Sequence, residues 1–141
     1  MILSCGKINL MSKASYKILI VDDDKMMRDI LTDRLSREPE LKISTANNGK
    51  EGLNIALADY PDLILLDVQM PVMDGITMMK ELRKVSTAQD IKVIFLTNFD
   101  TDEATLQQIA EYKPSFYLIK ANTNMDDVTR RVKEALGIWK S

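Results

Sequence analysis

Acidic, hydroxyl and basic side chains follow the short apolar runs of this chain. They are Asp22, Asp23 and Asp24 after the first run, Asp67 after the third, Thr97 after the fourth and Lys120 after the fifth. Clustered carboxylates repel one another unless a cation lies among them, and oxygen ligands suit Mg²⁺ or Mn²⁺. An ionised carboxylate can attack phosphorus without a general base, while a lysine and a hydroxyl stabilise the phosphoryl oxygens. If these residues meet, they indicate metal-dependent phosphoryl transfer to Asp67.

Taken one at a time, several of these residues also have ordinary structural explanations. An Asp such as Asp24, placed before a helix, is typically an N-cap, and Thr97 suits a strand. Lys120 fits a solvated surface charge. Asp67 is harder to explain in this way, because it follows four aliphatic residues at the end of a buried strand, where an unpartnered carboxylate is costly. The combination therefore favours the functional interpretation.

The apolar runs alternate with segments of helical spacing. The runs are residues 18–21, 43–46, 63–66, 93–96 and 116–119. The first helix is indicated by Met27, Ile30, Leu31 and Leu35, and the others by about residues 50–58, 75–85, 102–112 and 125–136. Continuous apolar runs are typical of strands covered on both faces. The order predicts a doubly wound α/β fold, (βα)5, with a five-stranded parallel sheet whose carboxyl ends bring the polar residues together.

Several polar and small residues are expected to set the element boundaries. Asn47 and Asn48 read as capping residues for the second helix, and Asp74 for the third. Gly75 permits a tight entry to the third helix, and Gly137 is expected to end the last one.

Composition excludes several classes of function. The chain of 141 residues has no histidine, which removes His-based acid–base catalysis and His metal ligands. Its single cysteine, Cys5, allows no intramolecular disulfide, which fits a reducing cytoplasmic compartment. A net charge of −2 gives no basic excess for nucleic acid. No apolar run reaches the roughly 18–20 residues of a membrane span, so we expect no membrane or nucleic-acid partner.

The sequence predicts one domain. Residues 1–15 lack clear periodicity and are interpreted as a loose N-terminal extension, while residues 16–138 hold all five strand–helix units. Since the chain ends soon after the fifth helix, we expect no output domain on it, and a signal would leave through a protein partner or through self-association.

Four segments resemble the receiver domain of bacterial response regulators, particularly the stand-alone form related to the chemotaxis regulator. They are residues 18–24 (ILIVDDD), 65–75 (LLDVQMPVMDG), 95–97 (FLT) and 117–120 (YLIK). Their spacing also agrees, and the resemblance covers about residues 16–138. It implies a flavodoxin-like sheet with strand order 2-1-3-4-5 and a role in two-component signal transduction.

The resemblance implies a metal-dependent phosphorylation site. Asp67 would accept the phosphoryl group from a phosphohistidine of a sensor histidine kinase or phosphotransfer protein. Asp22 and Asp23 would bind Mg²⁺, with Mn²⁺ as an alternative, and Asp67 and the backbone carbonyl of Gln69 would complete the protein ligands. The chain would thus catalyse only its own phosphorylation and dephosphorylation and would not be an enzyme towards other substrates.

The resemblance also implies a switch. Thr97 and Lys120 would contact the phosphoryl group, and Tyr117 would move inward with Thr97. The change would reshape the surface of the fourth helix, fifth strand and fifth helix, towards an unknown protein target. The chain would be a monomer or a weak, phosphorylation-dependent dimer.

Two departures from the family pattern leave an alternative open. Ala121 stands where the family usually has proline after the lysine, so we expect a trans bond, because a cis bond before a non-proline residue costs about 2.5–4 kcal/mol. Asn98 stands where small residues are common. Both slightly favour a pseudo-receiver, a binding module that is not phosphorylated. The intact set of Asp22, Asp23, Asp67, Thr97 and Lys120 argues against it, and labelling by acetyl phosphate would discriminate the two.

Two further alternatives fit the sequence less well. A phosphatase of the haloacid-dehalogenase type needs a second Asp two residues after the nucleophile, where this chain has Gln69. A flavodoxin-like cofactor binder needs donors after the first strand, but Asp22 and Asp23 would repel a phosphate that lacks a metal. Turnover of a phosphate ester that depends on Asp67 would favour the phosphatase.

Overall fold

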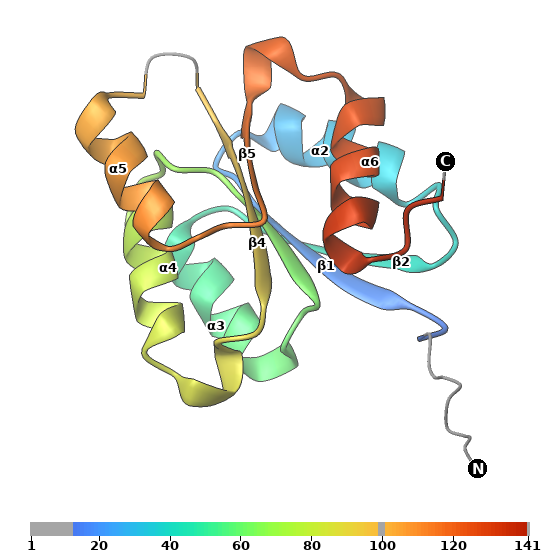
Figure 1. Ribbon diagram of the computed structural model, residues 1–141, viewed down its shortest axis with the longest axis horizontal. Coiled ribbons are helices and arrows are strands. Elements are labelled where there is room, and N and C mark those ends of the chain that lie inside the picture. Colours follow the sequence, from blue (N-terminus) through green and yellow to red (C-terminus); the bar gives the residue numbers. More distant parts are fainter. Residues whose placement is uncertain (1–12, 99–100, 141) are drawn as a thin grey trace.

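Five parallel strands form the centre of the molecule, in the order β2-β1-β3-β4-β5 (Figure 1). The computed structural model describes residues 13–98 and 101–140. The strands are β1 (Tyr16–Val21), β2 (Leu41–Ala46), β3 (Leu63–Leu66), β4 (Lys92–Thr97) and β5 (Phe116–Ile119). The predicted parallel α/β sheet and its strand order are confirmed. β1 and β2 both begin earlier than the apolar runs indicate, because Tyr16 and Lys17 pair with Leu41 and Lys42.

Helices cover both faces of the sheet. They are α2 (Lys25–Leu35), α3 (Gly49–Asp59), α4 (Gly75–Arg83), α5 (Glu103–Glu111) and α6 (Met125–Leu136). Figure 1 shows α2 and α6 on one face and α3, α4 and α5 on the other. The third predicted helix was too long by two residues. Two short 3₁₀ helices, η1 (Ser86–Ala88) and η2 (Lys120–Asn122), were not predicted, since one turn is too short to show a period.

The sheet separates two hydrophobic cores. Alternate residues of β1 point to opposite faces: Leu19 and Val21 pack towards α3, α4 and α5, whereas Ile18 and Ile20 pack towards α2 and α6. All four residues of β3, 63–66, are buried. This two-sided burial explains why the strands are continuous apolar runs.

Side-chain caps begin α2, α3 and α4 as the sequence predicts, with one correction at α3. Asp24 accepts a hydrogen bond from the N–H of Met26, and Asp74 caps α4. At α3 the cap is Asn48 alone. Asn47 instead donates its backbone N–H to the Glu51 carboxylate at 2.7 Å. Because the Glu51 N–H in turn donates to Asn48 Oδ1 at 2.9 Å, the start of α3 resembles a capping box.

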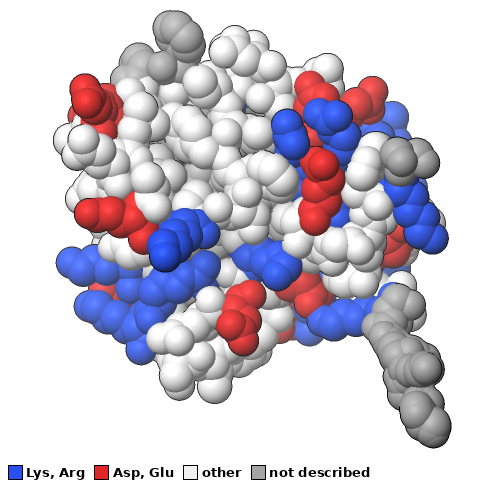
Figure 2. Space-filling model, in the orientation of Figure 1, with Lys and Arg blue, Asp and Glu red and all other residues white. Residues whose placement is uncertain are grey.

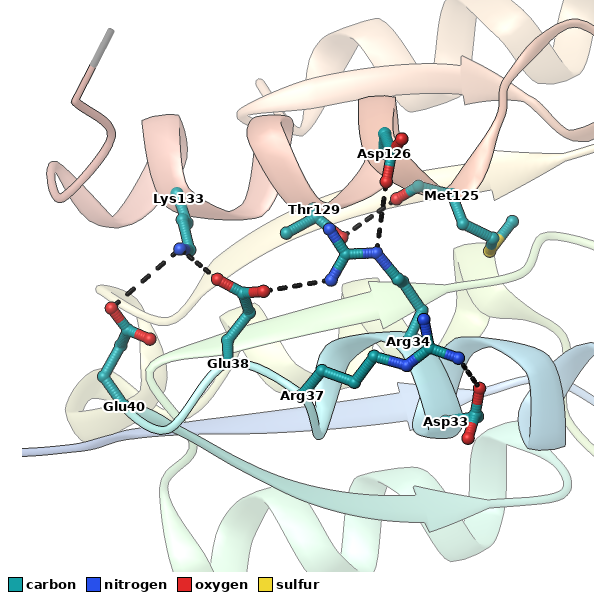
Figure 3. A network of polar contacts seen from close by, with 9 residues as sticks. All are labelled: Asp33, Arg34, Arg37, Glu38, Glu40, Met125, Asp126, Thr129 and Lys133. Atoms are coloured by element: carbon teal, nitrogen blue, oxygen red, sulfur yellow. Dashed lines mark hydrogen bonds and ion pairs between the residues drawn. The ribbon is translucent and has the colours of Figure 1, made fainter.

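A network of ion pairs joins the end of α2 to α6, and we call it the α2–α6 brace (Figure 3). Arg34 Nη1 lies 3.0 Å from Glu38 Oε2, and Arg34 Nε lies 3.2 Å from Asp126 Oδ1. Lys133 pairs with Glu38 and lies 3.9 Å from Glu40 Oε2. Hydrogen bonds from Lys133 and Arg34 hold the pKa of Glu38 below its ordinary value. The brace therefore connects two helices on the same face of the sheet through paired charges.

The predicted extension, residues 1–15, lies outside the described residues for its first twelve positions, which include Cys5. Among the described residues, no helix has the length and apolarity needed to cross a membrane.

Figure 2 shows Lys and Arg gathered at the lower left, at the end of α4, where Lys80 and Arg83 occupy the last turn. Cations at this end of a helix complement its dipole.

Candidate functional site

Asp22 and Asp67 lie side by side because the strands before them are neighbours. β1 and β3 pair in parallel with Val21 opposite Leu66, and each carboxylate residue follows directly. Asp22 and Asp67 are 2% and 3% exposed, whereas Asp23 is exposed. Ligand oxygens of the three residues lie within 4.8 Å of one another. The structure thus groups three carboxylates, two of which are buried, and we call the group Asp22, Asp23 and Asp67 the acidic pocket.

Lys120 reaches this pocket from the edge strand β5. It is the first residue of η2, directly after edge strand β5. Its Nζ lies 2.8 Å from Asp22 Oδ2 and 3.4 Å from Asp67 Oδ2. Its side chain is only 14% exposed, so little water screens these charges. One ammonium group therefore bridges two buried carboxylates.

The pKa values of Asp67 and of Lys120 are both raised in this pocket. Burial and the neighbouring charge of Asp22 raise the pKa of Asp67 to about 7, and Lys120 and the Val68 N–H offset this only in part. Burial opposes the charge on Lys120, but the hydrogen bond and attraction from the two carboxylates outweigh it, so the pKa of Lys120 is raised. A further cation in the pocket would stabilise the ionised form of Asp67.

Backbone N–H groups hold the two buried carboxylates, and an arginine holds the main chain of Asp22. Asp22 Oδ1 accepts the N–H of Asp24 at 2.9 Å, and Asp67 Oδ1 accepts the N–H of Val68 at 2.8 Å. Arg28 Nη1 donates to the main-chain oxygen of Asp22 at 2.8 Å. Arg28 was not predicted from the sequence. Its position near the start of α2 could have indicated it, because the helix dipole disfavours a cation there.

Gly75 is required by a close approach to the acidic pocket. A Cβ atom added at Gly75 would lie 2.1 Å from the main-chain oxygen of Asp67. The N–H of Gly75 donates to the Val68 oxygen at 2.8 Å. The residue thus permits the tight entry to α4 that was expected, and the reason is contact with the segment that carries Asp67.

The predicted switch residues Thr97 and Tyr117 lie on the neighbouring strands β4 and β5. Thr97 is 1% exposed at the end of β4, and its hydroxyl lies 2.9 Å from that of Thr101. Tyr117 pairs with Phe95 across β4 and β5, is half-buried and packs against the core under α3, α4 and α5. The predicted trans bond before Ala121 is confirmed. Gln69 is exposed on the loop after β3, and a ligand role for its carbonyl stays a prediction.

Comparisons with known proteins agree on one family. The sequence model described as "Response regulator receiver domain" matches residues 18–133. "Probable C4-dicarboxylate response regulator DctR" from Bacillus subtilis is 30% identical over 111 residues, which cover 78% of this chain and 48% of that protein. A protein-glutamate methylesterase/protein-glutamine glutaminase from Methanosarcina acetivorans is 33% identical over 132 residues, which cover 86% and 36%.

A solved structure has the same fold. Chemotaxis protein CheY4 of Vibrio cholerae superposes with a TM-score of 0.77 at 26% identity, over 86% of this chain and 99% of that one. By contrast, the chain spans about half or less of the length of the two curated relatives named above.

Proposed function

Because the chain belongs to the family of response regulator receiver domains, we propose that it accepts a phosphoryl group on Asp67 in a magnesium-dependent reaction. The receiver domain would span residues 16–138. The observation that carries the proposal is the pocket itself: Asp22, Asp23 and Asp67 lie within 4.8 Å of one another, and Lys120 pairs with the two buried members. The donor would be a sensor histidine kinase or a phosphotransfer protein.

The acidic pocket fits a divalent cation. Two of its three carboxylates share Lys120, and burial together with the charge of Asp22 raises the pKa of Asp67. Such hard oxygen ligands suit Mg²⁺ or Mn²⁺. Asp22, Asp23 and Asp67 would hold the ion, with the main-chain carbonyl of Gln69 as a further ligand. When bound, the ion would neutralise the carboxylates and the phosphoryl oxygens.

The residues of the pocket suit an in-line transfer. A carboxylate oxygen of Asp67 attacks phosphorus of the phosphohistidine, so that an O–P bond forms as the N–P bond breaks and the imidazole nitrogen keeps the electron pair. Lys120 lies where it can neutralise a phosphoryl oxygen. Thr97 would donate its hydroxyl proton to another. The chemistry would be confined to this chain's own phosphorylation and dephosphorylation. The methylesterase activity in the name of the longer relative is not part of this proposal.

The signal would leave through the surface of α5, β5 and α6. Figure 2 shows a broad area with few charges in its upper part, in the region of α5 and β5. An apolar hollow of about 340 Å³ lies there, lined by Leu106, Ile109, Ala110, Pro114 and Tyr117. Inward movement of Tyr117 would change the shape of this hollow. The receiving partner would be a protein that recognises the altered surface, or a second copy in a weak phosphorylation-dependent dimer.

Intact mass after incubation with Mg²⁺ and acetyl phosphate tests the proposal. We expect one phosphoryl group on the native chain and none on Asp67→Asn. Asp90→Asn, an exposed site just before β4, is the matched control and should label like the native chain. If the native chain gains no mass while a known receiver does, the pseudo-receiver function replaces the one proposed.

A further inference from the structure

The hydroxyl of Thr97 is held by a second threonine. Thr97 is buried at the end of β4, and Thr97 Oγ1 lies 2.9 Å from Thr101 Oγ1. Thr101 is half-buried and directly precedes Asp102, the N-cap of α5. The contact therefore links the end of a buried strand to the start of α5, which forms part of the proposed output surface.

The direction of this hydrogen bond follows from counting protons. Thr101 Oγ1 donates to the main-chain oxygen of Asn98 at 2.9 Å. A hydroxyl carries one proton, so Thr101 has none left for Thr97. Thr97 must then donate its own proton to Thr101. While this bond holds, Thr97 has no proton to donate to a phosphoryl group on Asp67.

We infer that Thr101 is a positioning residue that holds Thr97 in its resting orientation and so sets how readily the domain switches. The inference rests on the proposed function, in which Thr97 donates to the phosphoryl group. On switching, the Thr97 hydroxyl exchanges Thr101 for a phosphoryl oxygen, and no covalent bond changes. Thr101 thus favours the resting state of a two-state equilibrium that phosphorylation biases the other way.

The expected change in the switching equilibrium follows from the loss of one hydrogen bond, the one between Thr97 and Thr101. The net contribution of a neutral hydrogen bond corresponds to a factor of about three to ten in an equilibrium constant, and water can partly replace the partner of a half-buried hydroxyl. When the resting state predominates, the apparent affinity for a ligand of the switched state changes by the same factor as the equilibrium.

Beryllofluoride, a phosphoryl mimic, provides the test on the full chain with Mg²⁺. The dissociation constant of beryllofluoride is measured by titrating it into the protein and following the amide NMR signals. We expect Thr101→Val and Thr101→Ala to bind about three to ten times more tightly than the native chain, and Thr101→Ser, which keeps the hydroxyl, to bind like it. Thr87→Val is the matched control, because Thr87 Oγ1 lies 3.0 Å from the Tyr60 hydroxyl, away from the pocket, and its affinity should not change.

A double-mutant cycle separates the hydrogen bond from a general effect of the loop. In a Thr97→Val background no hydroxyl remains for Thr101 to hold. Adding Thr101→Val there should leave the affinity for beryllofluoride unchanged.

The outcomes distinguish the inference from the function on which it rests. A native chain that neither binds beryllofluoride nor labels with acetyl phosphate overturns the proposed function, and the inference with it. A native chain that binds, with Thr101→Val and Thr101→Ala unchanged, overturns the inference alone. So does tighter binding that persists in the Thr97→Val background or that Thr101→Ser also shows.

Discussion

Two clusters of acidic and basic residues in this molecule shift the pKa of a carboxyl group in opposite directions. In the α2–α6 brace, hydrogen bonds from Lys133 and Arg34 lower the pKa of Glu38. In the acidic pocket, burial and the charge of Asp22 raise the pKa of Asp67 to about 7. Glu38 has a cation on each side and is 19% exposed, whereas Asp67 is 3% exposed and shares Lys120 with Asp22.

The difference indicates that the α2–α6 brace stabilises the fold, whereas the acidic pocket is arranged to bind a cation. In the brace, two cations already pair with Glu38. The pocket holds more negative charge than its lysine offsets, so it gains stability when a metal ion or a proton enters. Four predictions address this contrast, in order of decreasing effect.

Removing the lysine of the pocket should have the largest effect. Lys120→Met leaves Asp22 and Asp67 buried without their cation, so we expect the free energy of unfolding to fall by about 2–4 kcal/mol at pH 8 with EDTA. Mg²⁺ should restore much of this loss, since it binds the folded pocket. Urea unfolding with EDTA and with Mg²⁺ measures both effects. Lys133→Met is the control in the brace, and a similar rescue of that variant by Mg²⁺ would remove the contrast.

Removing the charge of Asp67 should stabilise the metal-free protein. Asp67→Asn keeps the shape of the side chain and ends the repulsion with Asp22, so we expect the free energy of unfolding to rise by about 1–3 kcal/mol at pH 8 with EDTA. The same urea experiment measures it. A loss of stability would show that Asp67 is well compensated by Lys120.

The equivalent change in the brace should act in the opposite direction. Glu38→Gln weakens charged hydrogen bonds to Arg34 and Lys133, and we expect the free energy of unfolding to fall by about 1–2 kcal/mol. Phosphoryl labelling of Asp67 should stay at the native level, because the brace lies in another part of the molecule. Reduced labelling of a folded Glu38→Gln protein would connect the two clusters.

The pH dependence of stability should be the smallest effect per unit of pH. A carboxyl group whose pKa is raised on folding binds more protons in the folded state, so stability falls as pH rises from the ordinary value of 3.8 towards about 7. In EDTA we expect a loss of about 0.5–1 kcal/mol per unit between pH 5 and 7. Asp67→Asn should flatten this slope. Glu38, with its lowered pKa, stabilises the protein above its unfolded pKa and loses this contribution only as pH falls through its lower folded value.

The sequence predicted the fold well because the apolar runs of a parallel sheet are continuous. It also predicted that Asp22, Asp67 and Lys120 would meet, since each directly follows a parallel strand. It did not predict the contact of Arg28 with the Asp22 main chain or that of Thr101 with Thr97. Those contacts depend on the path of loops and on side-chain rotamers, which hydrophobic periodicity does not describe.

The pocket is assembled from strand ends that are far apart in the chain, and this has a consequence for biosynthesis. The ribosome makes β1 and β3 with Asp22 and Asp67 well before β5 and Lys120, and β5 joins the sheet only at its outer edge. A nascent chain that has paired β1 with β3 therefore presents two adjacent carboxylates without their lysine. The pocket is complete only when translation has passed residue 120 and the last strand has docked.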